Sequence, residues 1–112
     1  MQVVLTMLPT HLLKFPDDNR ARLFLASRLA IVGKIDEARE QLRVALSQSP
    51  DDPLVQYNAA CAYAQLGDIH LSVQTLRSAF AAGYEYADWI KRDSDLDPIR
   101  HDPEYIELMK GR

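Results

Sequence analysis

The sequence predicts an all-α protein built from antiparallel helix pairs. Apolar residues recur at the three- and four-residue spacing of helix faces. The sequence also repeats at a fixed interval: Gly33 recurs as Gly67, and Pro16 recurs as Pro50 one such period later, each proline followed by two aspartates. Strand signals are missing, since no segment shows sustained alternation and no Asn-Gly or Asp-Gly turn occurs.

The first repeat is predicted over residues 19–52 as two helices. Asp17 or Asp18 can cap the first helix, because a carboxylate accepts the free backbone N–H groups of a helix start. Gly33 should end that helix, since glycine adopts the left-handed conformation at little cost. The second helix is expected from about Ile35 to Gln48, with Pro50 marking its exit.

The second repeat is predicted over residues 53–86 with the same order of signals. Asp52 is a good cap, and the proline after it is a good first helical residue. Gly67 should end this helix and Asp68 should cap the next, which ends near Gly83. Small residues recur one period apart, as at Ala26 and Ala60, and they let helices approach closely.

Both ends of the chain look like caps on the repeats. Residues 1–16 should form a partial preceding helix, because Pro9 would break a continuous one. A capping helix and tail are expected over residues 87–112, with the helix starting near Glu85. Asp-Pro pairs at 97–98 and 102–103 should each start a helix. Apolar side chains of this tail should cover the open end of the array: Leu96, Ile99, Tyr105, Ile106 and Leu108.

The stretch from Tyr57 to Asp68 resembles the first helix and turn of the tetratricopeptide repeat (TPR) family. The TPR unit is about 34 residues long, which matches the interval between Gly33 and Gly67. Arg22, Leu29, Ser72 and Tyr84 depart mildly from the family pattern. The resemblance implies one TPR domain over residues 1–112, folded as a short right-handed α-solenoid. The C-terminal segment is similar to the end of TPR arrays in bacterial signalling proteins, including certain kinases and nucleotide cyclases.

The resemblance also implies a function, namely protein–protein interaction through a concave groove lined by the first helix of each repeat. Aromatic and aliphatic side chains beside an amide and cations would suit a peptide with a carboxylate. By the family's register, the peptide-binding residues would be Arg20, Leu23, Phe24, Ser27, Ile31, Leu54, Tyr57, Asn58, Cys61, Gln65, Lys91 and Arg92.

Composition limits the partners and the compartment. With 112 residues the chain has room for one domain, and a net charge of −3 argues against nucleic acid as the main partner. No apolar run approaches the roughly 20 residues that span a bilayer, and Met1 to Leu8 lacks the marks of a signal peptide. One cysteine makes no internal disulfide, which fits a cytoplasmic protein.

Chemical functions find little support in the sequence. Asp93, Asp95, Asp97 and Glu104 have the spacing of a calcium loop, but Pro98 stands where such a loop needs glycine. The remaining candidates lack partners: the three histidines (His11, His70, His101) are too scattered for zinc, and Cys61 has no adjacent base. We therefore expect no metal, no cofactor and no enzyme activity.

A TPR clamp for the acidic tails of chaperones is also incomplete. Asn58 and Arg92 fall at two of its positions, but Leu23, Ser27 and Asp88 occupy places where the clamp needs lysine or asparagine. Three hypotheses therefore stand: an adaptor or scaffold that binds a partner protein, the C-terminal regulatory region of a larger bacterial signalling enzyme, and weak self-association through the Met1–Phe15 side.

Overall fold

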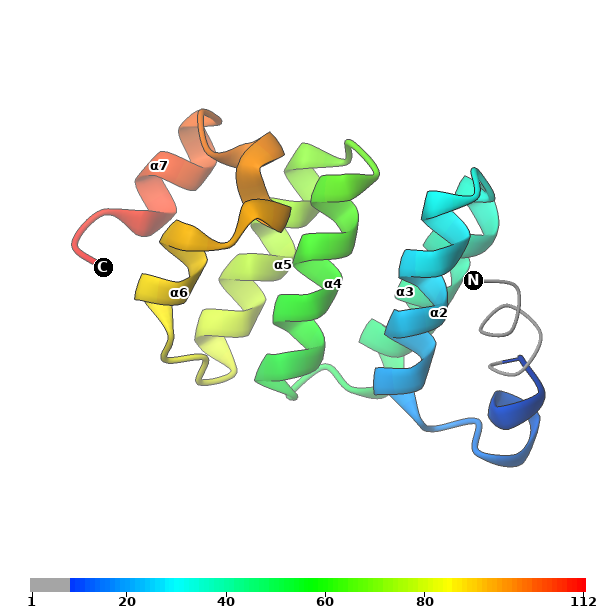
Figure 1. The fold of residues 1–112 in the computed structure, drawn as a ribbon. Coiled ribbons are helices and arrows are strands. Elements are labelled where there is room, and N and C mark those ends of the chain that lie inside the picture. The colour runs from blue at the N-terminus through cyan, green and yellow to red at the C-terminus, as the bar shows by residue number, and fades with distance from the viewer. Residues whose placement is uncertain (1–8) are drawn as a thin grey trace. The chain divides into compact units, whose positions relative to one another are not determined.

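Residues 9–112 are described by a computed structural model, and within them every regular element is a helix (Figure 1). The all-α prediction is therefore confirmed. The chain divides into two compact units, Met1–Pro50 and Asp51–Arg112, and the division falls next to the predicted start of the second repeat. Residues 9–14 are helical, whereas the first half of the partial helix predicted over 1–16 lies outside the described residues.

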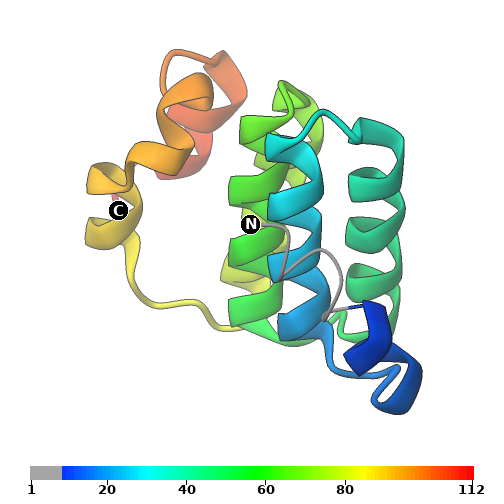
Figure 2. The same ribbon diagram turned by 45° about the vertical axis from the view of Figure 1, so that its right-hand side comes forward.

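The first unit contains one antiparallel helix pair, α2 (Asn19–Ile31) and α3 (Ile35–Gln48) (Figure 2). Asp18 caps α2, since its carboxylate accepts from the Ala21 N–H at 3.1 Å. Gly33 ends α2 with a φ of 85°, and the next N–H returns to the Leu29 carbonyl at 2.9 Å. A small apolar cluster holds the pair together: Leu12, Leu25, Leu29 and Ala38.

The second unit begins with an equivalent pair, α4 (Pro53–Gln65) and α5 (Ile69–Ala81). Each helix starts one full period after its counterpart, so the predicted period is confirmed at the level of helices. Asp52 caps α4 by accepting from two backbone N–H groups, and Gly67 ends it with a φ of 80°. Asp68 holds the N-cap position of α5, but its side chain accepts no capping hydrogen bond, contrary to prediction.

One polar contact distinguishes the second pair. The Ser72 hydroxyl of α5 donates to the Ala60 carbonyl of α4 at 2.7 Å, and Ser72 is fully buried. This bond ties the two helices where small side chains let them approach. The positions one period earlier are Ala38 and Ala26, which are buried and have no hydroxyl to offer.

Three short helices complete the second unit: α6 (Ala87–Arg92), the 3₁₀ helix η1 (Ser94–Ile99) and α7 (Pro103–Met109). Asp102 caps α7 as predicted. The predicted helix start at Asp97 is wrong, because Asp93 is the N-cap of η1 and Pro98 lies inside that helix. The Asp97 carboxylate instead pairs with the Arg100 guanidinium at 2.9 Å.

The C-terminal segment supplies much of the core of the second unit. Leu96 and Ile99 of η1 are fully buried in the cluster formed by α4, α5 and α6, and Tyr105 of α7 is buried beside them. The prediction that Ile106 also covers this core is wrong: the side chain is 50% exposed, because neighbouring residues point to different sides of a helix. No helix within residues 9–112 is long and apolar enough to cross a membrane.

Candidate functional site

The first predicted groove helix, α2, presents a stripe of exposed side chains. Arg20, Phe24, Ser27 and Ile31 are exposed at three- and four-residue spacing, so they lie on one side of the helix. Leu23, which was predicted to line the same surface, is 5% exposed. The structure therefore places four of the five residues predicted on α2 within reach of a partner.

Phe24 and Ile31 make this stripe apolar, with exposed fractions of 46% and 63%. The Arg28 guanidinium carbon lies 4.8 Å from the centre of the Phe24 ring, which places a cation over the aromatic face. Covering large apolar side chains that are exposed along one helix face lowers the free energy, because their surface is removed from water. The stripe therefore combines exposed apolar side chains with a cation at its edge.

On α4 the predicted groove residues divide into exposed and buried ones. Leu54 is 38% exposed, and Asn58 and Gln65 are also exposed. Tyr57 and Cys61 are only 4% and 8% exposed, because η1 packs against this side of α4 (Figure 1). These two side chains therefore offer little surface to a separate peptide.

Asp93, just before η1, is the residue that joins the C-terminal segment to α4. Its carboxylate accepts from the Tyr57 phenol and lies 3.8 Å from the Cys61 sulfur. It also caps η1 by accepting from the Asp95 N–H at 3.0 Å, while the Gln65 amide donates to the Asp95 carbonyl at 2.8 Å. The polar residues predicted to meet a ligand here meet the chain's own backbone and carboxylate.

Burial and the Asp93 charge shift the titration of this cluster. Burial, reinforced by the nearby carboxylate, raises the pKa of Cys61 to about 12. Burial is likewise the main cause that raises the pKa of Tyr57, followed by its hydrogen bond to Asp93. The nucleophile of cysteine chemistry is the thiolate. Cys61 is therefore a protonated, packed thiol at neutral pH.

Three potential metal ligands lie in the same region. Among residues 9–112, Cys61, Asp93 and Asp95 bring ligand atoms within 4.8 Å of one another, whereas Asp97 and Glu104 of the predicted acidic loop do not join them. Asp93 is engaged with donors of the protein, and the thiol is protonated. Proximity alone does not make this group an ion site.

The predicted cations of α6 are exposed and lie beside one another. The Lys91 ammonium contacts the Asp88 carboxylate at 3.7 Å and also donates to the Arg112 carbonyl. The Arg92 Nε donates to the Asp88 carbonyl at 3.4 Å. Neither cation is buried, so both can reorient toward a ligand.

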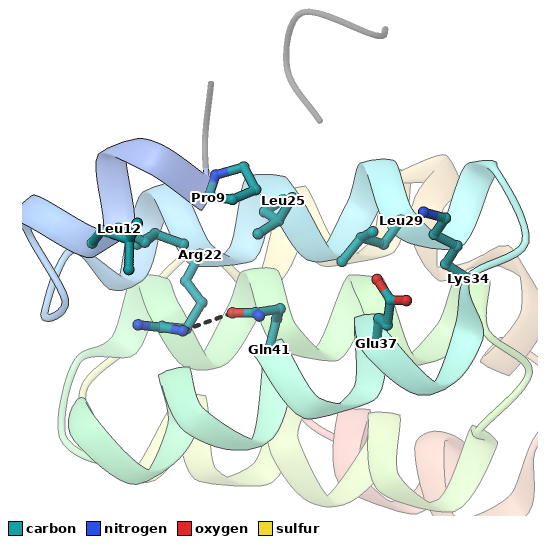
Figure 3. Close-up of a pocket in the computed structure, with 9 residues that line it drawn as sticks. Pro9, Leu12, Arg22, Leu25, Leu29, Lys34, Glu37 and Gln41 are labelled. Carbon is teal, nitrogen blue, oxygen red and sulfur yellow. Dashed lines mark hydrogen bonds between the residues drawn. The ribbon is translucent and has the colours of Figure 1, made fainter. Parts of the chain in front are cut away.

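A cavity of about 480 Å³ lies in the first unit beside α2 and α3 (Figure 3). Its apolar wall includes Leu12, Leu25 and Leu29, and its polar rim includes Arg22 and Gln41, whose side chains share a hydrogen bond of 2.7 Å. The cavity lies on the side for which the sequence predicts weak self-association. That prediction has a direct test, the dependence of sedimentation on protein concentration.

A second cavity, of about 500 Å³, was missed by the sequence analysis. It lies in the second unit between the α5–α6 connection and α6, and three of its lining residues are aromatic: Tyr84, Tyr86 and Trp89. The signal was present as three aromatic residues within six positions after Gly83. Of the groove positions that the family's register predicts, the cavity contains Arg92.

Two helix pairs, an exposed apolar stripe on α2 and a buried thiol on α4 define an all-helical protein. The chain is similar to a chloroplastic protein of Arabidopsis thaliana, with 31% identity over 81 residues. The match includes 70% of this chain and 24% of the relative, so the chain spans about a quarter of that protein's length. No family model matches the chain, and no solved structure matches it.

Proposed function

We propose that this chain is a TPR-type module that binds a protein or peptide segment and performs no catalysis. The observation that carries the proposal is the exposed apolar stripe of α2, presented by a helix pair whose register recurs in the next pair. In this proposal the pairs are consecutive repeats of a right-handed α-solenoid, and the first helices α2 and α4 contribute to its concave face.

The ligand contacts follow from the exposed side chains. Phe24 and Ile31 would be covered by apolar side chains of the partner, which stabilises the complex by about 25 cal/mol per Å² of apolar surface removed from water. On α4, Leu54 adds a further apolar contact and Asn58 can pair with the backbone of a bound segment. Arg20 and Arg92 favour a partner that carries carboxylates.

The proposal includes no nucleophilic catalysis by Cys61. A thiol whose pKa is raised to about 12 supplies almost no thiolate near neutral pH. The cytoplasm remains the proposed compartment. The relative's name places that relative in the chloroplast, so localisation of the tagged full-length protein in its own organism tests this part.

The proposal is tested by the double variant Phe24→Ala/Asn58→Ala. The partner is first recovered by affinity capture from the source organism and then purified, and its affinity is measured by calorimetric titration. The double variant should bind at least about tenfold more weakly, the equivalent of about 1.4 kcal/mol, with an unchanged helical circular dichroism spectrum. Leu71→Ala is the matched control, because Leu71 is an equally exposed apolar residue on α5. Equal affinity of the double variant and the wild type would refute the α2–α4 surface.

A second candidate function is the regulatory TPR region of a larger signalling enzyme. It is favoured by the length of the relative, in which the similar segment is 24% of the protein. In such an enzyme the same surfaces would contact the enzyme's own catalytic domain. The full-length gene separates the candidates, because an upstream kinase or nucleotide cyclase domain would support the second.

A further inference from the structure

The aromatic cavity of the second unit has an acidic rim. Tyr86 and Trp89 are 67% and 53% exposed. The charged residues that line the cavity beside them are Glu85, Asp88 and Arg92, so the lining carries one net negative charge. Exposed rings alone fit many ligands, but the charges next to them select among those ligands. The lining favours a group that is flat or apolar and positively charged.

The two carboxylates of the rim differ in what already neutralises them. The Asp88 carboxylate contacts the Lys91 ammonium at 3.7 Å, and Lys91 itself does not line the cavity. The Glu85 side chain is exposed and forms no ion pair or hydrogen bond with another residue of the 9–112 range. The Arg92 Nε donates to the Asp88 carbonyl at 3.4 Å. Glu85 is therefore the carboxylate that remains available to a ligand.

A further negative charge lies behind the aromatic wall. Tyr84 stacks on Tyr57 of α4, with ring centres 4.6 Å apart, and the Tyr57 phenol donates to the Asp93 carboxylate. Burial is the main cause that raises the pKa of Tyr84, and the charge of Asp93 contributes to the same shift. A cation at these rings is attracted both by the ring faces and by the nearby carboxylates.

Two other aromatic rings of the chain already have an arginine over their face. The guanidinium carbon of Arg28 lies 4.8 Å from the centre of the Phe24 ring, and that of Arg112 lies 4.0 Å from the centre of the Phe80 ring. No cation within the described part of the chain lies over the ring of Tyr86 or Trp89. Tryptophan is the strongest aromatic partner of a cation. The place that arginine takes on the phenylalanines is thus open to a cation from another chain.

Arginine suits this combination of rings and carboxylate better than lysine. A guanidinium is planar and weakly hydrated, so it stacks on an aromatic face while its N–H fork pairs with a carboxylate. A lysine ammonium is compact and strongly hydrated, and it makes neither contact in this way. The cavity of about 500 Å³ has room for an arginine side chain.

We infer that the cavity lined by Tyr84, Tyr86 and Trp89 binds an arginine side chain of a partner protein. The guanidinium stacks on the exposed rings of Tyr86 and Trp89 and pairs with the Glu85 carboxylate. The inference rests on the proposed function, which it deepens by naming the side chain that the partner presents to the α6 side of the second unit.

The chain offers a built-in probe, because Trp89 is its single tryptophan. A blocked glycine–arginine–glycine peptide is titrated into the full chain at low salt, and Trp89 emission is recorded. A saturable change is expected, with a dissociation constant of about 1 mM. The same peptide with citrulline, which keeps the shape of arginine but has no charge, should bind at least about tenfold more weakly. The lysine peptide should bind at least about threefold more weakly.

Two variants test the residues assigned to the site. Glu85→Gln and Tyr86→Ala should each weaken binding of the arginine peptide at least about threefold, with an unchanged circular dichroism spectrum. Both variants keep Trp89 as the reporter. Glu40→Gln is the matched control, because it removes the same charge from an exposed side chain of α3 in the first unit. It should bind the peptide as the wild type does.

Any of three results would overturn the inference: no saturable binding of the arginine peptide up to about 10 mM, equal affinity for the citrulline or the lysine peptide, or unchanged binding by Glu85→Gln or Tyr86→Ala. If the arginine peptide fails to bind while the native partner still depends on Phe24 and Asn58, this inference falls alone. If the peptide binds through Glu85 and Tyr86 while the partner ignores Phe24 and Asn58, the α2–α4 surface falls instead.

Discussion

The two helix pairs share one register but differ in what lies against their first helix. On α2 the stripe that includes Phe24, Ser27 and Ile31 is exposed. On α4 the residues one period later include Cys61, which is buried under η1, and Gln65, which bonds to the backbone of η1. The stripe on α2 is thus exposed along its length, whereas on α4 Tyr57 and Cys61 are covered and Leu54, Asn58 and Gln65 remain exposed.

The difference lies in the residues at equivalent positions of the two repeats, because those on α4 contact the C-terminal segment. Two positions of the exposed stripe on α2 correspond to residues that contact the C-terminal segment on α4: Ser27 corresponds to Cys61 and Ile31 to Gln65. The Cys61 sulfur lies 3.8 Å from the Asp93 carboxylate, and the Gln65 amide donates to the Asp95 carbonyl at 2.8 Å. The covered part of α4 therefore carries side chains that contact the start of η1, whereas Ser27 and Ile31 on α2 are exposed.

The largest expected effect comes from removing the cover. Leu96→Ala deletes a fully buried side chain of η1 that packs in the core of the second unit. The lost burial and the cavity left behind should lower the free energy of unfolding by about 2–5 kcal/mol. Urea denaturation followed by circular dichroism measures the change.

Ile106→Ala is the matched control for this variant. Ile106 belongs to the same C-terminal segment but is half exposed, so its truncation should cost about 0.5 kcal/mol or less. If the two variants had the same stability, η1 would not contribute to the core, and the contrast between the covered and the exposed face would lose its energetic basis.

Much of the fold could be predicted from the sequence because its signals are local. Aspartate caps and glycine stops act within one helical turn, so Asp52, Gly33 and Gly67 located the helices of both pairs. The C-terminal segment was harder. Asp97-Pro98 and Asp93-Ser94 are both acceptable helix starts, and the choice of Asp93 depends on its contact with Tyr57, a residue 36 positions away.

The candidate site was predicted less completely, for a related reason. A family's register can give the side of a helix that a residue occupies, and it placed the exposed Phe24 and Ile31 on one stripe. It does not show what else will pack there, so the covering of Cys61 by η1 was not foreseen. The aromatic cavity depends on Tyr86 and Trp89 staying uncovered, which is a property of tertiary structure.

The next expected effect comes from cutting the polar link between η1 and α4. Asp93→Ala removes the acceptor for the Tyr57 phenol and the cap on the Asp95 N–H. Tyr57 is 4% exposed as a residue, and its hydroxyl would be left without that acceptor, so the variant should lose about 1–3 kcal/mol of stability. Urea denaturation at neutral pH measures the loss.

Asp97→Ala is the control for the loss of a negative charge near η1 without loss of a contact with α4. Asp97 lies in the same 3₁₀ helix, but its side chain is 66% exposed in its pair with Arg100. Exposed ion pairs contribute about 0–1 kcal/mol. A loss as large as that of Asp93→Ala would show that charge near η1, and not the link to α4, stabilises the segment.

The smallest effect at neutral pH is expected from exchanging a single atom, the sulfur of Cys61, for oxygen. Cys61→Ser places on α4 the residue that stands one period earlier on α2, Ser27. The hydroxyl can replace the thiol as donor to Asp93, so the stability at pH 7 should change by about 1 kcal/mol or less. The change in pH dependence should be larger than the change at pH 7.

The sign of that pH dependence follows from the Cys61 pKa, which folding raises from 9.0 to about 12. Below pH 9 the thiol is protonated in both states; between about pH 9 and 12 the unfolded chain releases the proton and the folded chain keeps it. Stability should therefore fall as pH rises through this window. Cys61→Ser removes the thiol's share of the fall, while Tyr57 and Tyr84, whose pKa values are also raised by burial, keep theirs. Urea denaturation of both proteins from pH 8 to 10 measures the difference. If the free energy of unfolding fell equally with pH in both proteins, Cys61 would titrate as an exposed thiol. In that case η1 would not cover Cys61 in solution.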